Sequence, residues 1–335
     1  MNAVKLFLRP TRAGAFSIEN LFQALFPYIQ KQMPSELYTI SYASLGVKLR
    51  LKILQEVKRE RSSFLNHITG DVNFIALALQ KETTILTIHD LESFEREGKL
   101  THHFIRFFWL YLPLKRVKYI TVISEASKNK LLHSFCFLKT ADIKVIPNCL
   151  TSNIQFSEKE FDAQQPVILQ IGTKENKNLP NLINAIAPLQ CILIIVGQLN
   201  TMIRQLLKEQ SIKYENFVNI SNEEIQALYR RCDLVTLVST FEGFGLPILE
   251  GNAAGRPVIT SDLSSMPEVA GDAALLVNPY DITAIREAIV SVVQSPELRL
   301  DLIRKGQKNI RRFAPETVAA QYVELYRRVI ALNEA

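Results

Sequence analysis

Long apolar runs, cysteine pairs and a secretion signal are absent from this chain of 335 residues. No uninterrupted apolar segment reaches the roughly 18–20 residues that a membrane-spanning helix needs. The first residues contain a short apolar segment but neither a signal-peptide core nor a small-residue cleavage site, so we interpret them as a strand. The four cysteines are widely spaced and form no disulfide or metal-ligand pattern, which is typical of a protein in the reducing cytoplasm.

Several nucleotide-binding signatures are also missing. Neither the P-loop spacing nor G-x-G-x-x-G occurs, and this disfavours an NTPase or a dinucleotide dehydrogenase. The chain has a formal net charge of +6, but no nucleic-acid-binding motif accompanies it. We therefore expect no nucleic-acid partner.

Length, composition and charge indicate what is present. A chain of this length is longer than a single hydrophobic core usually supports, which favours two domains. Its 47% hydrophobic and 21% charged content is ordinary for a soluble globular protein. Residues 1–150 hold 21 lysines and arginines against 12 acids, whereas the remainder holds 18 against 21. This asymmetry suggests that the N-terminal half meets an anionic surface, such as a membrane.

Two segments of that half carry most of the basic and aromatic character. Residues 46–61 read GVKLRLKILQEVKRER, which fits either a solvated helix face or a membrane-facing patch. Residues 102–118 read HHFIRFFWLYLPLKRVK, which fits either plain core or an interfacial amphipathic segment. Both alternatives stay open for both segments.

The order of apolar segments predicts the architecture. Strands alternate with helices throughout, which predicts parallel sheets with right-handed crossovers. We expect one α/β domain at 1–150 and a second at 166–315, joined by a polar, non-periodic linker at 151–165.

One stretch of the second half has a strand–turn–helix–strand pattern. The apolar run Leu234–Val238 predicts a buried strand, and a glycine-rich turn follows it. A helix begins at Leu246, continues to Ala254 and is capped by Gly255, after which Pro257–Thr260 predicts the next strand. The backbone N–H groups at the start of this helix favour a phosphate.

Two glutamates bracket that turn and helix. Glu242 and Glu250 are eight residues apart, just over two helical turns, so both carboxylates can face one crevice. A carboxylate is a good acceptor for the two hydroxyls of a vicinal diol, such as a ribose or hexose edge. The alternative is that both are solvated helix glutamates.

The residues around Glu242 read EGFGLP, and with them the stretch resembles the E-x7-E signature of retaining glycosyltransferases of family 4. Residues 264–274, SSMPEVAGDAA, resemble the continuation of the same family's pattern. The match is dense from about 166 to 290 and thinner before. The resemblance implies the α/β GT-B architecture, with two Rossmann-like parallel-sheet domains, a cleft between them, and a final helix at 316–335 that crosses back to the N-terminal domain.

The resemblance also implies roles for individual residues in binding a nucleoside-diphosphate sugar. The donor diphosphate is expected to meet Gly14, Lys174, Lys177, Gly243, Phe244, Gly245 and Leu246. Glu250 is expected to hold the ribose hydroxyls, and the loop containing Asn219 and Ile220, at the end of a short strand expected over Phe217–Ile220, borders the nucleobase. For Lys177 the alternative is a solvated loop lysine.

Two residues are expected to act at the transferred sugar. His89 follows the expected strand Thr83–Ile88, and ligands bind at the carboxyl ends of strands in open α/β sheets. In similar enzymes this histidine lies near the sugar, whereas a lone histidine is otherwise often structural. Glu242 is expected to contact the sugar hydroxyls. No Asp-x-Asp metal motif occurs, so a lysine and a helix start can stabilise the leaving phosphate, and we expect no metal or other cofactor.

The resulting hypothesis is a retaining glycosyltransferase. It moves a hexosyl group from a nucleoside-diphosphate sugar to a saccharide or lipid-linked saccharide, in surface polysaccharide assembly. We expect it in the cytoplasm, either free or attached peripherally at the inner face of the membrane. Two alternatives stay open: a sugar-nucleotide epimerase of the same fold, and a non-catalytic subunit that binds a sugar nucleotide.

Overall fold

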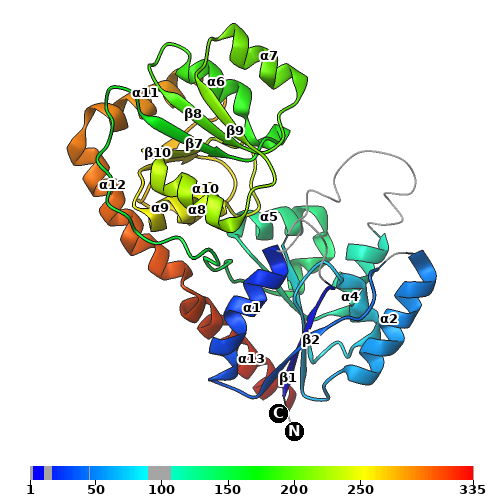
Figure 1. Ribbon diagram of the computed structural model, residues 1–335. Helices are drawn as coiled ribbons and strands as arrows, with labels where there is room; N and C mark the ends of the chain where they lie inside the picture. Colours follow the sequence, from blue (N-terminus) through cyan, green and yellow to red (C-terminus); the bar gives the residue numbers. More distant parts are fainter. Residues whose placement is uncertain (1–2, 11–16, 45, 90–106, 335) are drawn as a thin grey trace. The chain divides into compact units, whose positions relative to one another are not determined.

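The computed structural model describes residues 3–10, 17–44, 46–89 and 107–334 (Figure 1). The chain forms two compact units: Met1–Thr151 together with Phe313–Ala335, and Ser152–Arg312 between them. The chain therefore enters the N-terminal unit twice. The segment expected as a linker, 151–165, has no helix or strand, and from Ser152 onward it belongs to the C-terminal unit.

The N-terminal unit is built on a six-stranded sheet whose paired strands are all parallel. Its strands are β1 (Val4–Leu8), β2 (Ser35–Thr39), β3 (Leu65–Ile68), β4 (Thr84–Ile88), β5 (Tyr119–Val122) and β6 (Asp142–Val145). They lie in the order β2-β1-β3-β4-β5-β6. The four inner strands are buried along their whole length, as expected for a parallel sheet covered on both faces.

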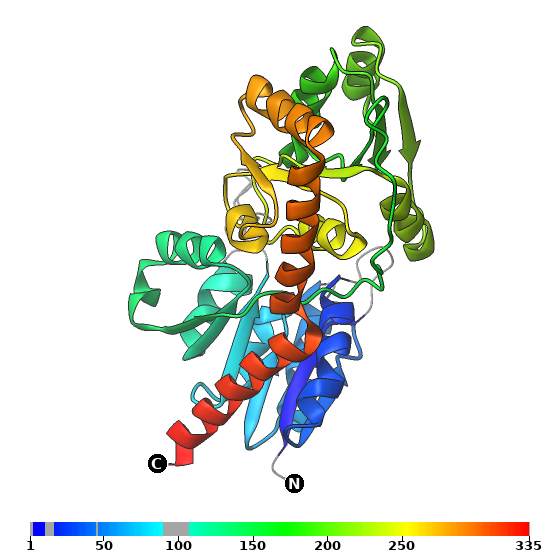
Figure 2. The ribbon, with the colours of Figure 1, turned by 90° about the vertical axis from the view of Figure 1, so that its left-hand side faces the viewer.

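Helices cover both faces of this sheet. The elements are α1 (Ser17–Gln30), α2 (Gly46–Glu60), the 3-10 turn η1 (Asn73–Ala78), the π-helical turn η3 (Phe107–Tyr111), α4 (Leu112–Arg116), α5 (Glu125–Ser134), the 3-10 turn η4 (Cys136–Thr140) and α13 (Pro315–Glu334). One face packs against α1 and α13, whose apolar side chains share a single core cluster with β1. Figure 2 shows α13 lying along the sheet of this unit. The opposite face packs against α2, η1 and α4.

The C-terminal unit has a second six-stranded sheet, also parallel throughout. Its strands are β7 (Val167–Ile171), β8 (Ile192–Val196), β9 (Tyr214–Phe217), β10 (Leu234–Leu237), β11 (Val258–Ser261) and β12 (Leu275–Val277), in the order β12-β11-β10-β7-β8-β9. The prediction of two parallel α/β sheets is confirmed. The expected strand Phe217–Ile220 is wrong, because β9 ends at Phe217 and Asn219 takes a left-handed φ of 55° that no strand accommodates.

The helices of this unit also follow the expected alternation. They are η5 (Glu175–Lys177), α6 (Leu179–Ile186), α7 (Thr201–Glu209), α8 (Asn222–Arg231), α9 (Leu246–Ala254), α10 (Met266–Ala270), α11 (Ile282–Gln294), α12 (Pro296–Asn309) and η6 (Ile310–Phe313). The predicted bounds of α9 are confirmed, and Gly255 ends it with a φ of 74°. Within the described part of the chain, no helix is long and apolar enough to cross a membrane.

Each sheet has one point where the direction of winding reverses. In the N-terminal unit β1 lies between β2 and β3, and in the C-terminal unit β7 lies between β8 and β10. Ligands of open α/β sheets bind beyond the carboxyl ends of the strands at such a point. In the C-terminal unit, these are the loops that follow β7 and β10.

Candidate functional site

In the loop after β7, the side chain of Lys177 packs over Gly172. Gly172 has a φ of +92°, which favours glycine, and a Cβ there would lie 2.9 Å from Cε of Lys177. The absence of a side chain therefore lets the lysine stem pass directly over the backbone. This packing confines the ammonium group to one side of the loop.

Two asparagines bind the loop after β7 to the loop after β10. The Asn176 amide donates to the Phe241 carbonyl over 2.9 Å, and the Thr240 N–H donates to the Asn176 carbonyl over 2.8 Å. Asn178, which has a left-handed φ of 55°, donates to the Val238 carbonyl over 3.0 Å. The strands are neighbours in the sheet, and these bonds hold their following loops together.

Lys177 and Glu242 meet where those loops join. The Lys177 Nζ lies 2.6 Å from Oε1 of Glu242, and the Ser239 hydroxyl donates to the same oxygen over 2.6 Å. The lysine side chain is 16% exposed and the glutamate side chain 12% exposed. Two residues that the sequence assigned separately to the donor thus form one partly buried ion pair at the reversal point of the sheet.

Serines from the loop after β11 hold the turn that contains Glu242. The Ser264 hydroxyl donates to the Glu242 carbonyl over 2.7 Å. The Ser265 hydroxyl lies 2.9 Å from the same carbonyl and 2.8 Å from that of Phe244. Gly245, with a φ of 109°, is the N-cap of α9, and the cap position makes no side-chain hydrogen bond. The start of α9 is thus fixed beside the ion pair.

Glu250 lies further along α9 and has a buried partner. The Tyr229 hydroxyl, on α8, donates to its Oε2 over 2.7 Å. Burial raises the pKa of Glu250, and the Tyr229 hydrogen bond opposes that rise. Burial also raises the pKa of Tyr229 well above its ordinary value, so the phenol stays protonated and remains a donor. Glu250 is therefore held in one orientation.

The other residues expected to bind the donor lie further from this ion pair or outside the described residues. Lys174 is exposed on the same loop as Lys177. Asn219 and Ile220 follow β9, and β7 and β8 separate that strand from β10. At about 4.8 Å per strand, this places the end of β9 roughly 14 Å from the end of β10. Gly14 lies outside the described residues.

His89 lies at the carboxyl end of β4 in the N-terminal unit. Its Nε2 donates to the Thr69 carbonyl over 2.7 Å, and a Cβ on Gly70 would lie 2.5 Å from its ring. Burial lowers the pKa of His89, although the hydrogen bond to Thr69 opposes that shift. The imidazole is therefore neutral near pH 7, with its proton on Nε2.

An ion cluster lies beside this histidine, in which Arg9 and Glu19 are buried and Asp71 is partly exposed. Arg9, directly after β1, donates from Nε and Nη2 to the two carboxylate oxygens of Glu19, over 2.5 and 3.2 Å. Its Nη1 donates to Asp71, which follows β3. Arg9 was assigned no role from the sequence. Its position immediately after a buried strand was the signal that could have marked it.

Three further residues of the C-terminal unit were not assigned a role from the sequence. Ser239 follows β10 directly, and a polar residue at that edge is a usable sequence signal. Tyr229 and Ser265 reach their partners across 21 residues of chain each, so no local pattern reveals them. In the described parts of the chain, no three His, Cys, Asp or Glu side chains gather as a metal site.

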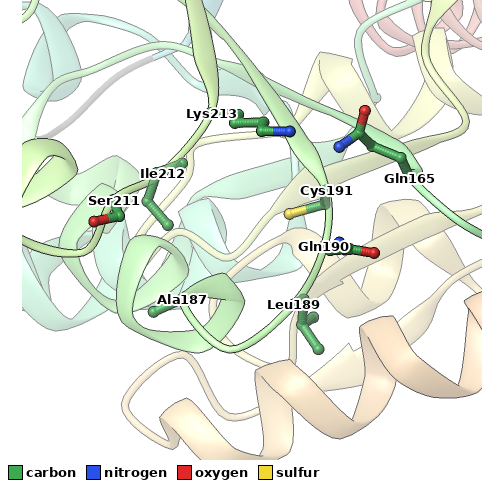
Figure 3. A pocket seen from close by; sticks show the side chains of 8 residues that line it. All are labelled: Gln165, Ala187, Leu189, Gln190, Cys191, Ser211, Ile212 and Lys213. Atoms are coloured by element: carbon green, nitrogen blue, oxygen red, sulfur yellow. The ribbon is translucent and has the colours of Figure 1, made fainter.

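A small pocket lies at the opposite end of the strands of the C-terminal sheet (Figure 3). It is lined by Gln165, Cys191 and Lys213, which precede β7, β8 and β9, and by their neighbours. Its volume of about 160 Å³ is below the roughly 300 Å³ at which sites for larger ligands begin. Because the pocket lies at the amino ends of the strands, it is separate from the loops that carry Lys177 and Glu242 at their carboxyl ends.

Comparison with known proteins supplies an independent result. Residues 152–309 match the family described as "Glycosyl transferases group 1". O-antigen chain mannosyltransferase B from Escherichia coli is 27% identical over 270 residues, which cover 73% of this chain and 70% of that protein.

Two solved structures match nearly the whole chain. Sucrose-phosphate synthase from Thermosynechococcus elongatus has a TM-score of 0.75 and 18% identity, with 99% of this chain and 100% of that chain covered. Anabaena Alr3699/HepE, in complex with UDP and glucose, also has a TM-score of 0.75 and 18% identity, with 98% and 100% covered. At this identity the likeness shows the fold alone.

Proposed function

We propose, from the premise that this chain carries a group 1 glycosyltransferase domain and has the paired parallel sheets of the GT-B fold, that it transfers a hexosyl group. The donor is a nucleoside-diphosphate sugar, the acceptor is a saccharide or lipid-linked saccharide, and the anomeric configuration is retained. One observation carries this proposal: Lys177 and Glu242 contact each other at the reversal point of the C-terminal sheet, beside the start of α9.

The diphosphate of the donor binds Lys177 and the first turn of α9. As the anomeric bond breaks, charge develops on the leaving phosphate, and preorganised positive groups stabilise it. Lys177 supplies a full charge and the helix start supplies oriented N–H groups. Lys174, exposed on the same loop, supplies a second cation at the solvent side.

The two glutamates hold the sugars of the donor. Glu242 accepts hydrogen bonds from the hydroxyls of the transferred hexose, and Glu250 accepts them from the ribose. Tyr229 keeps the Glu250 carboxyl oriented for this task. Asn219 and Ile220 border the nucleobase, and neutral His89 takes part in the transfer step. Substitution of His89 tests this role. The expected result is loss of sugar transfer with unchanged binding of the donor.

Ligand-induced stabilisation tests the donor class. Bound ligand stabilises by about 2.7 kcal/mol at a hundredfold excess over Kd, which a thermal-shift measurement resolves. Because named relatives include O-antigen mannosyltransferases and a protein solved with UDP and glucose, GDP-mannose and UDP-glucose head the panel. Absence of any shift across a full panel of sugar nucleotides would contradict the proposal.

Transfer itself needs a second assay. The donor found above is incubated with oligosaccharide and lipid-linked acceptors, and the anomeric configuration of the product is read by NMR. Donor incubated alone should stay unchanged. Formation of an isomeric sugar nucleotide in the absence of acceptor would instead identify an epimerase.

We also propose that transfer needs no metal ion, since Lys177 and the start of α9 take the place of a cation. The expected result is full turnover in excess EDTA. Complete loss of turnover in chelator, with recovery on adding Mg²⁺ or Mn²⁺, would reject this part of the proposal.

The N-terminal unit has a surface suited to an anionic membrane. On α2, Val47 is 70% exposed and Leu51 is 55% exposed, and both lie beside the exposed bases Lys48 and Lys52. Apolar side chains flanked by lysines are typical of helices that lie in the membrane interface. We propose that this stripe docks the enzyme near a lipid-linked acceptor.

Vesicle co-sedimentation tests the docking. At roughly 1 kcal/mol per base, the double substitution Lys48→Ala/Lys52→Ala should weaken binding to phosphatidylserine-containing vesicles about thirtyfold. A matched control, Lys208→Ala/Lys213→Ala, removes two exposed lysines from the C-terminal unit and should leave binding unchanged. Equal effects of the two double substitutions would reject the α2 stripe as the docking surface.

A further inference from the structure

The lysine that is to receive the diphosphate already has a negative partner. Lys177 Nζ lies 2.6 Å from Glu242 Oε1, and this distance marks a direct ion pair. From this contact we infer that Glu242 is a specificity-determining residue: it makes the site favour an intact sugar nucleotide over the free nucleoside diphosphate. The inference rests on the proposed function and adds to it a way of rejecting the product.

The ion pair is held on both sides. The lysine stem lies across Gly172, so the ammonium has little room to move away from Glu242. On the glutamate side, Ser239 is fully buried and donates to the same Oε1. In the described part of the chain, Glu242 Oε2 takes no hydrogen bond. Rotation of the carboxylate away from Lys177 therefore breaks only the two hydrogen bonds to Oε1.

A diphosphate cannot join this pair without changing it. Phosphate oxygens that reach Lys177 come within a few ångströms of the Glu242 carboxylate, and like charges at that distance disfavour each other. The site is only partly exposed, so solvent screens the repulsion less than it does at an open surface. Binding of the diphosphate thus requires Glu242 to turn away from Lys177.

The sugar decides whether that turn is compensated. A hexose attached to the diphosphate offers hydroxyl donors to Glu242, which replace the hydrogen bonds lost from Lys177 and Ser239. A free nucleoside diphosphate offers no such donors, so the carboxylate stays near Lys177 and opposes it. After the hexose has been transferred, Glu242 returns to Lys177 and the nucleoside diphosphate is expelled.

The experiment compares two probes in the wild-type protein and in Glu242→Gln by calorimetry. The first is inorganic pyrophosphate, which needs no knowledge of the base. The second is the sugar nucleotide that gives the largest thermal shift, with UDP-glucose and GDP-mannose tested first. Glu242→Gln should bind pyrophosphate about tenfold more tightly, because the repulsion is gone, and the sugar nucleotide about tenfold more weakly.

Two further variants make the result specific. Glu175→Gln removes the same charge from an exposed residue of the Lys177 loop, and it should leave the ratio of the two Kd values unchanged. Ser239→Ala keeps the charge but removes one tether, and it should shift the ratio in the direction of Glu242→Gln by about threefold. Ser239→Ala thus tests the inference even where Glu242→Gln does not fold.

The outcomes separate the inference from the function it rests on. A wild-type protein that binds no sugar nucleotide and no pyrophosphate refutes both. A wild-type protein that binds sugar nucleotides, with a Glu242→Gln variant that binds pyrophosphate equally or more weakly, refutes the inference and leaves the function in place. A ratio that moves as much in Glu175→Gln as in Glu242→Gln overturns it as well, because a general charge effect then suffices.

Discussion

The two units place an ion pair at the same position in the sheet but in different surroundings. Counted from each unit's first strand, the orders are 2-1-3-4-5-6 in the N-terminal unit and 3-2-1-4-5-6 in the C-terminal unit. An ion pair spans the reversal point in both. In the first unit Arg9 joins Asp71, and in the second Lys177 joins Glu242.

The difference lies in the cation and its surroundings. Arg9 is 6% exposed at its side chain and binds Glu19 through two parallel hydrogen bonds, in addition to Asp71. Lys177 is 16% exposed and, among the residues that the structure describes, pairs with a single carboxylate. A planar guanidinium with two anions is a fixed structural joint, whereas a point charge with one anion can exchange its partner for a ligand. Burial and the number of partners thus separate the two pairs, and the substitutions below test whether the first is structural and the second exchangeable.

The largest expected effect comes from breaking the structural pair. Arg9→Gln leaves the buried Glu19 carboxylate without its cation, and such a loss costs about 3–5 kcal/mol of unfolding free energy. Trp109 is the single tryptophan and lies in the N-terminal unit, so its fluorescence during urea denaturation reports on that unit.

An exposed arginine of the same unit is the control for that substitution. Arg328 pairs with Asp142 at 2.8 Å with 45% of its side chain exposed, and Arg328→Gln should cost at most about 1 kcal/mol. If Arg9→Gln is as mild as Arg328→Gln, the pair is not a structural joint and the contrast between the units fails.

The next effect falls on activity. Lys177→Met keeps the apolar stem over Gly172 but removes the charge, and it should lower kcat/KM by about 10²–10³-fold. Lys305→Met, which breaks a helical i,i+4 pair with Asp301, serves as control and should leave kcat/KM unchanged. Stability of the N-terminal unit should not respond to either substitution. A loss below threefold in Lys177→Met would remove the lysine from the donor site.

A smaller effect concerns the acid side of the stability profile. His67 is fully buried between Tyr326 and Thr87, and burial lowers its pKa to about 3. The unfolded chain therefore takes up a proton near pH 6.5 that the folded chain refuses until about pH 3. The contribution of His67 to the free energy of unfolding is fully present above pH 6.5. From this group alone, the free energy of unfolding should fall by about 2.5 kcal/mol between pH 7 and pH 4.5.

The variant His67→Gln isolates this contribution. It removes the titrating group, so the difference in unfolding free energy between wild type and variant should shrink as the pH falls through that window. Urea denaturation followed by Trp109 fluorescence at several pH values measures it. A difference that is constant from pH 7 to pH 4.5 would contradict the assignment to His67.

The smallest effect sharpens the donor site itself. Tyr229→Phe removes the hydrogen bond to Glu250, worth about 0.5–1.5 kcal/mol, and should weaken sugar-nucleotide binding about two- to tenfold. Tyr214→Phe alters a partly exposed tyrosine on β9 and should have no effect. Pyrophosphate binding should not change in Tyr229→Phe, because Glu250 is expected to hold the ribose. An equal loss for both probes would indicate a general distortion of α9.

Part of this fold is readable from the sequence, and the exceptions have physical causes. The bounds of α9 follow from its proline-containing start and its glycine cap, and the apolar run Leu234–Val238 gives β10 to within one residue. Strand β3 was not predicted, because its LNHI sequence places two polar residues in a buried position. His67 is tolerated there by hydrogen bonds to Tyr326 and Thr87, which come from distant parts of the chain. Strand β2 was not predicted either, because it lies at the sheet edge and is only partly buried.

The candidate site divides in the same way. Local patterns mark Lys177, Glu242 and Glu250 as residues of interest. The contact between Lys177 and Glu242 spans 65 residues and depends on the adjacency of β7 and β10, which local pattern does not specify. The partners Ser239 and Tyr229 follow from that arrangement rather than from spacing. Sequence therefore indicates the chemical groups, and the sheet order determines which of them meet.

The second passage of the chain through the N-terminal unit has a consequence for its biosynthesis. Helix α13 contributes Val318, Tyr322 and Tyr326 to the core that β1 and α1 begin. A ribosome releases these side chains only after the whole of the intervening unit has been made, so the apolar face that α13 covers stays uncovered until that helix has been translated. Until the last helix arrives, that uncovered intermediate is the form most exposed to chaperones and to aggregation.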